Sequence, residues 1–110
     1  FMGRCFIKLH KRNLIIIGAR GFGREVYNML PNFSGYETEW SFKGFLDDSS
    51  DTQNKKYPLP ISSVEAYEIK KDDLFVCGLS DPFYKQKYIH MIKNKGGFFA
   101  NLIHQSAMIQ

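Results

Sequence analysis

Three glycines, Gly18, Gly21 and Gly23, separate an apolar stretch from a polar stretch with helical character. At the carboxyl end of a strand, one glycine permits a tight turn, and another lets backbone N–H groups approach phosphate oxygens at a helix N-terminus. The spacing is G-x-x-G-x-G, which differs from the G-x-G-x-x-G pattern of dinucleotide-binding domains. The loop therefore predicts an anion site, and the alternative is that the glycines serve only a tight turn.

Two adjacent carboxylates, Asp47 and Asp48, follow the next apolar stretch. At the end of a second strand a carboxylate can accept hydrogen bonds from a ribose hydroxyl or from the N–H of a base. Taken alone, the pair is better explained as a polar turn. Together with the glycine loop, the two aspartates indicate a nucleotide.

The elements that position these residues alternate between strands and helices. Residues 14–17 form a continuous apolar run, LIII, and residues 13–17 are therefore predicted to form a strand buried on both faces. Residues 21–30 predict a helix that ends at Pro31, and residues 40–46 predict a second strand. The helix is expected to pack through Phe22, Val26, Met29 and Leu30.

The second half of the chain continues the alternation. A short strand is possible at residues 57–59, and the capping-box spacing of Ser62 and Glu65 predicts a helix over residues 63–69. Residues 74–79 and 98–103 predict strands. Between them, Asp81 and Pro82 open a helix that runs to about residue 94 and ends at Gly96 and Gly97. This order predicts an α/β fold: a small Rossmann-like three-layer domain with a parallel sheet.

The composition agrees with one small globular domain. The chain has 110 residues, 44% of them hydrophobic, and a net charge of +4. The basic residues are scattered, so we expect no nucleic-acid partner. No apolar run is long enough to span a membrane or to act as a signal peptide, which predicts a cytoplasmic protein without membrane contact. Cys5 and Cys77 are expected to be idle thiols, and no metal-ligand spacing is present.

Four segments in order carry a family resemblance: IIIGARGFGREVY, KGFLDD, LFVCGLSDPFYKQKYI and ANLIHQSAMI. Over residues 13–110 the chain resembles the N-terminal domain of sugar O-acyltransferases of the sialic-acid O-acetyltransferase (NeuD) type. That family includes bacterial N-acetyltransferases that act on UDP-4-amino-sugars. There, a Rossmann-like domain binds the nucleotide sugar, and a left-handed β-helix of hexapeptide repeats forms the trimer, binds acetyl-CoA and supplies a catalytic histidine.

The resemblance implies a division of this chain and a set of binding residues. Residues 1–12 would be a leader, residues 13–103 the nucleotide-sugar-binding domain, and residues 104–110 the start of the junction to a β-helix. The implied substrate-binding residues are Gly18, Arg20, Gly21, Phe22 and Gly23 at the phosphates, Asp47 and Asp48 at the uridine, and Gly78, Leu79 and Ser80 beside the nucleotide.

The resemblance assigns no catalytic residue to this chain, and His90 and His104 are expected to be structural or solvated. Three positions depart from the family pattern. Arg20 replaces a small residue, Phe22 replaces a histidine found in some members, and Gln105 replaces a proline of the junction. The substrate is therefore expected to differ from that of some members.

Two functions of different class follow. The first is the UDP-sugar-binding domain of an acetyl-CoA-dependent sugar O- or N-acyltransferase of bacterial polysaccharide biosynthesis. The full protein would be a homotrimer, and this chain alone would be a monomer without activity. The second is a stand-alone regulatory module that binds a nucleotide without catalysis. An NAD-dependent oxidoreductase is a weaker hypothesis, because the glycine spacing differs and the chain has no room for a substrate domain.

Overall fold

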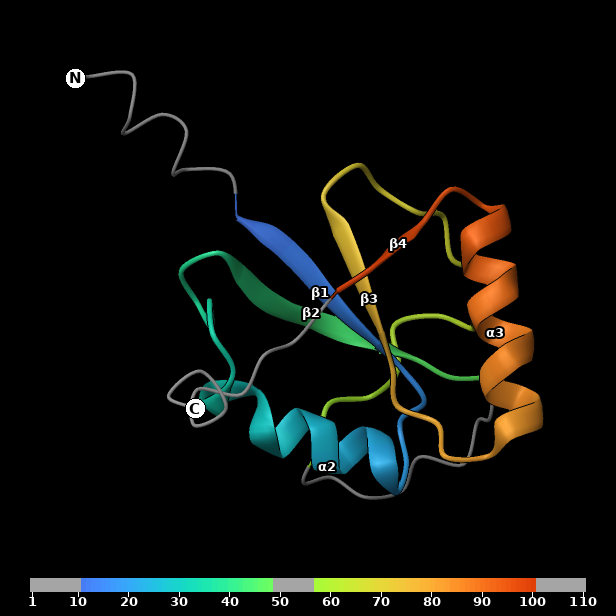
Figure 1. Ribbon diagram of the computed structural model, residues 1–110, viewed down its shortest axis with the longest axis horizontal. Coiled ribbons are helices and arrows are strands. Elements are labelled where there is room, and N and C mark those ends of the chain that lie inside the picture. Colours follow the sequence, from blue (N-terminus) through green and yellow to red (C-terminus); the bar gives the residue numbers. More distant parts are fainter. Residues whose placement is uncertain (1–10, 49–56, 101–110) are drawn as a thin grey trace, which may run out of the picture.

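The computed structural model describes residues 11–48 and 57–100, and these residues form an α/β domain (Figure 1). In chain order the elements are β1 (Arg12–Ile17), α2 (Phe22–Met29), the 3₁₀ turn η1 (Leu30–Asn32), β2 (Trp40–Leu46), β3 (Asp73–Cys77), α3 (Pro82–Asn94) and β4 (Phe98–Phe99). The Rossmann-like α/β fold expected from the sequence is confirmed. The predictions for Cys5, His104, Gln105 and the 104–110 junction concern residues outside the described part of the chain.

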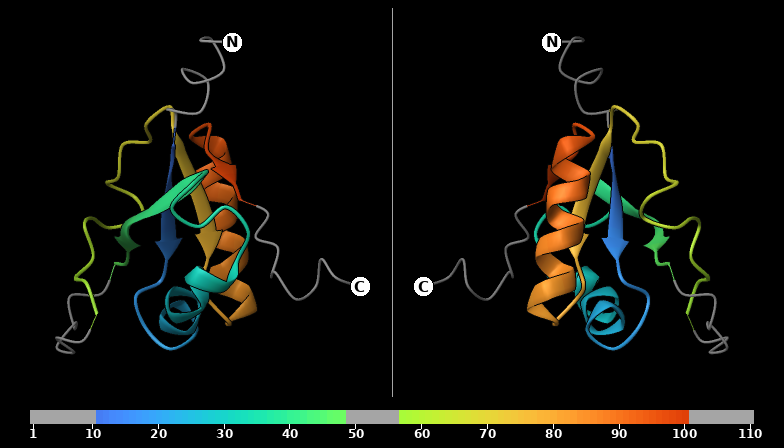
Figure 2. Two further views of the ribbon diagram at one scale, coloured as in Figure 1. Left: turned by 90° about the vertical axis from the view of Figure 1, so that its left-hand side faces the viewer. Right: turned by 90° about the vertical axis from the view of Figure 1, so that its right-hand side faces the viewer.

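The strands form a parallel sheet in the order β2-β1-β3-β4 (Figure 2). The chain leaves β1 toward β2 on one side of the sheet and leaves β3 toward β4 on the other. The connections therefore diverge between β1 and β3. In open α/β sheets, ligands bind in the crevice outside the carboxyl ends of the strands at this kind of divergence.

Strand β1 forms the centre of the core and is buried on both faces, as its continuous apolar run predicted. Leu14 and Ile16 belong to the core on the α2 side of the sheet. Ile15 and Ile17 belong to the core on the other side, where Phe75 and Ile92 of β3 and α3 pack. Because successive side chains of a strand point to opposite faces, one short run of sequence contributes to both layers of the core.

Helix α2 faces the sheet with a different set of residues from the one predicted. Phe22 is 46% exposed and Met29 42% exposed, whereas Gly23, Val26 and Leu30 are buried. The expectation that Phe22 and Met29 pack in the core was therefore wrong. The helix turns its small residue Gly23 inward because its first turn lies directly against the end of β1. It ends at Met29, and Pro31 lies within the following 3₁₀ turn.

The connection between β2 and β3 also differs from the prediction. No strand forms at residues 57–59; instead Ser62 forms a parallel bridge with Leu46, and the Ile61 N–H donates to the Phe45 carbonyl over 2.9 Å. The predicted helix over residues 63–69 is reduced to a turn, in which the Ala66 N–H donates to Ser63 Oγ over 3.1 Å. This segment therefore extends the edge of β2, because backbone pairing there outweighs a helix of under two turns.

The second helix agrees closely with its sequence signals. Helix α3 spans Pro82–Asn94, and Asp81 caps it by accepting a hydrogen bond from the Phe83 N–H over 2.9 Å. Gly96, with φ of 88°, turns the chain just beyond the helix. Strand β3 begins at Asp73 and ends at Cys77, earlier than predicted, and β4 covers Phe98–Phe99; residues 101–103 of its predicted range lie outside the described part. No described helix is long and apolar enough to cross a membrane.

Candidate functional site

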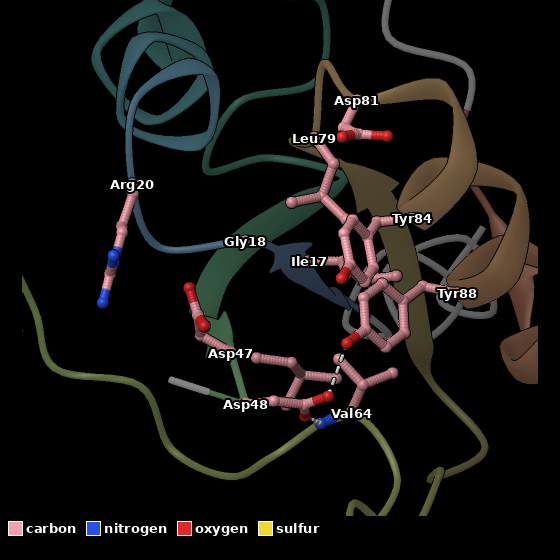
Figure 3. A pocket seen from close by; sticks show the side chains of 11 residues that line it. Ile17, Gly18, Arg20, Asp47, Asp48, Val64, Leu79, Asp81, Tyr84 and Tyr88 are labelled. Atoms are coloured by element: carbon pink, nitrogen blue, oxygen red, sulfur yellow. Dashed lines mark hydrogen bonds between the residues drawn. The ribbon is translucent and has the colours of Figure 1, made fainter. Parts of the chain in front are cut away.

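A cavity of about 500 Å³ opens at the carboxyl edge of the sheet (Figure 3). Its position is the divergence between β1 and β3, and its size is in the range of small-molecule sites. Residues from the ends of the strands, the following loops and α3 line it. They are Ile17, Gly18, Arg20, Leu46, Asp47, Asp48, Val64, Leu79, Asp81, Tyr84 and Tyr88.

The two aspartates predicted at the nucleoside form one wall of this cavity, and each is held by the protein itself. Asp47 Oδ2 accepts a hydrogen bond from the Ala19 N–H over 2.8 Å, which ties the end of β2 to the glycine loop. Asp48 Oδ1 accepts from the Val64 N–H over 2.9 Å, and its Oδ2 accepts from the Tyr88 hydroxyl over 2.6 Å. These contacts orient both carboxylates at the cavity wall, and a carboxylate oxygen can accept more than one hydrogen bond.

A second wall consists of two tyrosines of α3 that sequence reasoning missed. Tyr84 and Tyr88 lie across the cavity from Asp47, with Tyr88 in contact with Asp48 (Figure 3), and their rings stack with centroids 6.3 Å apart. A signal was present in the sequence, because residues 81, 84 and 88 share one face of the predicted helix. The sequence alone could not predict that this helix lies beside the aspartates, because that depends on the order of the strands in the sheet.

The hydroxyl of Tyr88 is held in its protonated form. Its hydrogen bond to Asp48, its burial and the nearby charges of Asp48 and Asp47 raise the pKa of Tyr88 to about 12. Tyr88 therefore remains a donor to Asp48 throughout the physiological pH range. The bond connects α3 to the end of β2 across the cavity.

Three of the predicted glycines hold the backbone together beneath the cavity. A Cβ on Gly23 would lie 1.9 Å from the Gly18 carbonyl oxygen, and a Cβ on Gly78 would lie 2.6 Å from the Gly23 Cα. Gly18 also has a φ of 101°, a conformation that L-residues with a side chain rarely adopt. The start of α2, the end of β1 and the end of β3 thus approach one another at a distance that only glycine permits.

The predicted binding residues divide into two groups around the cavity. Gly18, Arg20, Asp47, Asp48 and Leu79 line it. Gly21, Phe22, Gly23, Gly78 and Ser80 are not among its lining residues. Gly21 is the N-cap of α2, carries no side chain to cap the helix, and has open space where a Cβ would lie.

The charge of the lining is uneven. Asp47, Asp48 and Asp81 contribute carboxylates, and Arg20 contributes a guanidinium on the side of the glycine loop (Figure 3). The N-terminus of α2 begins two residues after Arg20 and adds the partial positive charge of a helix dipole. The cavity thus has carboxylates on several sides, and its positive charge lies beside the glycine loop, to which Asp47 is also bonded. In the described part of the chain, no group of three or more His, Cys, Asp or Glu side chains could hold a metal ion.

A second polar cluster lies at the opposite edge of the sheet and does not touch the cavity. Asp73 is buried and accepts hydrogen bonds from the Tyr67 hydroxyl over 2.6 Å, from the Lys70 N–H over 2.8 Å and from Lys43 Nζ over 3.3 Å. Burial by itself would raise the pKa of Asp73, but these hydrogen bonds outweigh it and lower that pKa. The cluster joins the first residue of β3 to β2 and is best explained as a structural element.

Comparison with protein families gives a match over most of the domain. The model of the PglD N-terminal domain family matches residues 13–92, a span that contains most of β1, all of α2, β2 and β3, most of α3 and every residue that lines the cavity. No curated protein and no solved structure gives a significant match. The matched span covers well over half of the chain and has the α/β architecture described above. On this evidence the chain belongs to the PglD N-terminal domain family.

Proposed function

We propose that this domain binds a nucleotide sugar, specifically a UDP-sugar, in the cavity between Asp47 and α3. It would do so as the substrate-binding part of an acetyl-CoA-dependent sugar acyltransferase. The family match supports a nucleotide-sugar-binding domain of an acyltransferase. The choice of uridine and of an acetyl donor rests on the resemblance to the NeuD-type sugar acyltransferases.

The observation that carries the proposal is the position of the cavity. It lies where the connections of β1 and β3 diverge, and it gathers Gly18, Asp47 and Leu79 from the ends of three parallel strands. These are the three places where an open α/β sheet contacts a nucleotide.

The distribution of charge indicates how the nucleotide is oriented in the cavity. The ribose hydroxyls and the N–H of a uracil are hydrogen-bond donors, and they suit the wall formed by Asp47 and Asp48. The diphosphate suits the glycine loop, beside Arg20 and the N-terminus of α2, where the guanidinium and the helix dipole favour negative charge. The sugar would then leave the cavity on the Arg20 side.

The chemical step belongs to another part of the proposed enzyme. In the proposal, a sugar amine or hydroxyl attacks the thioester of acetyl-CoA, and a histidine outside this chain accepts the proton. No residue of the described part is assigned to acetyl-CoA. Incubation of this chain with acetyl-CoA and UDP-sugars is expected to release no CoA above background, and the chain is expected to be monomeric.

Titration calorimetry with UDP, a UDP-sugar and NAD tests the proposal. UDP and the UDP-sugar are expected to bind, and NAD is expected not to. Asp47→Asn and Asp48→Asn should each weaken UDP about 2- to 100-fold, because a charged acceptor is lost. Glu39→Gln is the matched control, since this exposed carboxylate precedes β2 at the opposite edge of the sheet.

The results that contradict the proposal are specific. Tighter binding of NAD than of UDP would favour an oxidoreductase domain instead. A full-length protein that binds neither nucleotide would exclude the nucleotide-sugar function. Binding of UDP without hexapeptide repeats in the encoded gene would favour the stand-alone regulatory module.

A further inference from the structure

The tyrosine wall of the cavity has no assigned role. Tyr84 and Tyr88 are one helical turn apart on α3, and both rings face the space beside Asp48 (Figure 3). Neither residue contributes to the glycine loop or to the ends of the strands. The two residues are nevertheless held in a defined arrangement, because their rings stack on each other and Tyr88 bonds to Asp48.

Tyr88 is fixed at both ends. Its ring packs against the core between α3 and the sheet, and its hydroxyl donates to Asp48 Oδ2 over 2.6 Å. Asp48 is in turn fixed by the Val64 N–H over 2.9 Å. With its pKa raised to about 12, the hydroxyl does not lose this bond by ionisation near neutral pH. Tyr88 thus provides a rigid support within the cavity wall.

Tyr84 rests on that support and is itself largely uncovered. Its ring stacks on Tyr88 with an interplanar angle of 20°, yet its side chain remains 46% exposed. The ammonium of Lys87 lies 5.9 Å from the ring of Tyr84 and 5.6 Å from that of Tyr88. A preoriented, half-exposed aromatic ring in a cavity is a typical platform for a planar ligand group.

The groups across the cavity indicate which planar group fits. Asp47 presents a carboxylate across the cavity from the tyrosine wall, and Asp48 adjoins that wall through its bond to Tyr88. A heterocyclic base offers a flat face that stacks and an edge with N–H donors, whereas a diphosphate offers neither. The wall that stacks and the wall that accepts therefore match the two surfaces of one base.

We propose that Tyr84 is the stacking surface for the base of the bound nucleotide, with Tyr88 as the residue that positions it. The inference rests on the proposed function, in which the base is uracil. It adds a binding residue from α3 to a site otherwise formed by the strand ends. It also assigns the Asp48–Tyr88 bond a role, which is to hold the tyrosine wall in a fixed position relative to the end of β2.

Variants of Tyr84 test the inference by titration with UDP. Tyr84→Ala is expected to weaken UDP about 5- to 100-fold, the usual range for loss of one aromatic stacking partner, and Tyr84→Phe to stay within about twofold. Phe98→Ala is the matched control, because Phe98 is a 68% exposed aromatic at the opposite edge of the sheet. Circular dichroism of each variant checks that the fold is retained.

A second measurement is independent of affinity. Tyr84→Trp places an indole on the cavity wall, whereas the native Trp40 is only 5% exposed. UDP is expected to quench the fluorescence of the new indole by stacking, and pyrophosphate, which has no base, is expected not to.

The outcomes separate the inference from the proposed function. If the wild type binds UDP and Tyr84→Ala binds it equally well, the stacking role is wrong and the nucleotide site stands. The absence of quenching in a Tyr84→Trp variant that binds UDP contradicts the inference in the same way. If the wild type binds no nucleotide, the proposed function and the inference both fail.

Discussion

Substitution of Gly23 by alanine should disrupt the junction on which the cavity rests. The added Cβ would lie 1.9 Å from the Gly18 carbonyl oxygen and 2.9 Å from its carbonyl carbon. Real Cβ atoms essentially never approach another atom closer than 3.0 Å, so one of the two backbones must move by about 1 Å. The obstacle is a backbone group rather than the end of a flexible side chain, so it cannot simply rotate away.

The backbone around Gly18 has little freedom to yield. The Gly18 N–H donates to the Leu46 carbonyl over 2.7 Å, and the Gly78 N–H donates to the Ile17 carbonyl over 2.8 Å. Movement of the loop would strain these bonds and the contact between Gly23 and Gly78. Overpacking of a core costs typically 1–3 kcal/mol and occasionally more, so we expect a loss of about 3 kcal/mol or more in the free energy of unfolding.

Thermal unfolding followed by the fluorescence of Trp40, the single tryptophan, measures this loss. For a domain of this size about 3 kcal/mol corresponds to a decrease in Tm of roughly 12–24 °C. Gly96→Ala is the matched control, because Gly96 has a φ of 88° but open space at its Cβ position. Backbone strain alone should cost it about 1–2 kcal/mol. A Gly23→Ala variant as stable as Gly96→Ala would refute the close-approach argument.

Four further predictions follow from single contacts. Gly21→Ala meets no neighbouring atom, so the fold should survive with a strain of about 1–3 kcal/mol at its positive φ, while titration with UDP should show weaker binding. Asp81→Ala removes the cap of α3 and should lower the free energy of unfolding in urea by about 0.5–2 kcal/mol. The lowered pKa of Asp73 means that its contribution to stability is present above the ordinary carboxyl pKa and is lost as pH falls through the pKa of the folded state. The free energy of unfolding of Asp73→Asn should therefore be lower than that of the wild type at pH 7, and the difference should shrink in acid. The raised pKa of Tyr88 makes its contribution to stability complete below the ordinary tyrosine pKa and lost as pH rises toward about 12. A tyrosinate absorbance titration should show a late-ionising group that disappears in Tyr88→Phe, whereas Tyr67, whose pKa is also raised by burial and by its bond to Asp73, should still ionise late.

Part of the fold could be predicted because local chemistry specifies it. The apolar run of β1 can be buried only between two layers, and its burial on both faces is confirmed. Asp81 and Pro82 fix the start of α3 through a side-chain cap and a preset φ, and the helix begins where they predicted. Signals that depend on distant contacts were less reliable. The capping-box spacing at Ser62 did not produce a helix, because the same segment pairs with the edge of β2.

The sequence by itself determined the class of fold, the glycine loop after the first strand and the pair of aspartates after the second. These features depend on residues close together in the chain. Only the tertiary structure decided which face of α2 is buried, which glycines hold backbones together, and that Tyr88 bonds to Asp48 with Tyr84 beside it. The physical reason is that residues 48 and 88 meet only after the chain from β2 has crossed over β1 to form β3 and α3 has packed on the face of the sheet opposite α2. No local periodicity encodes that crossing.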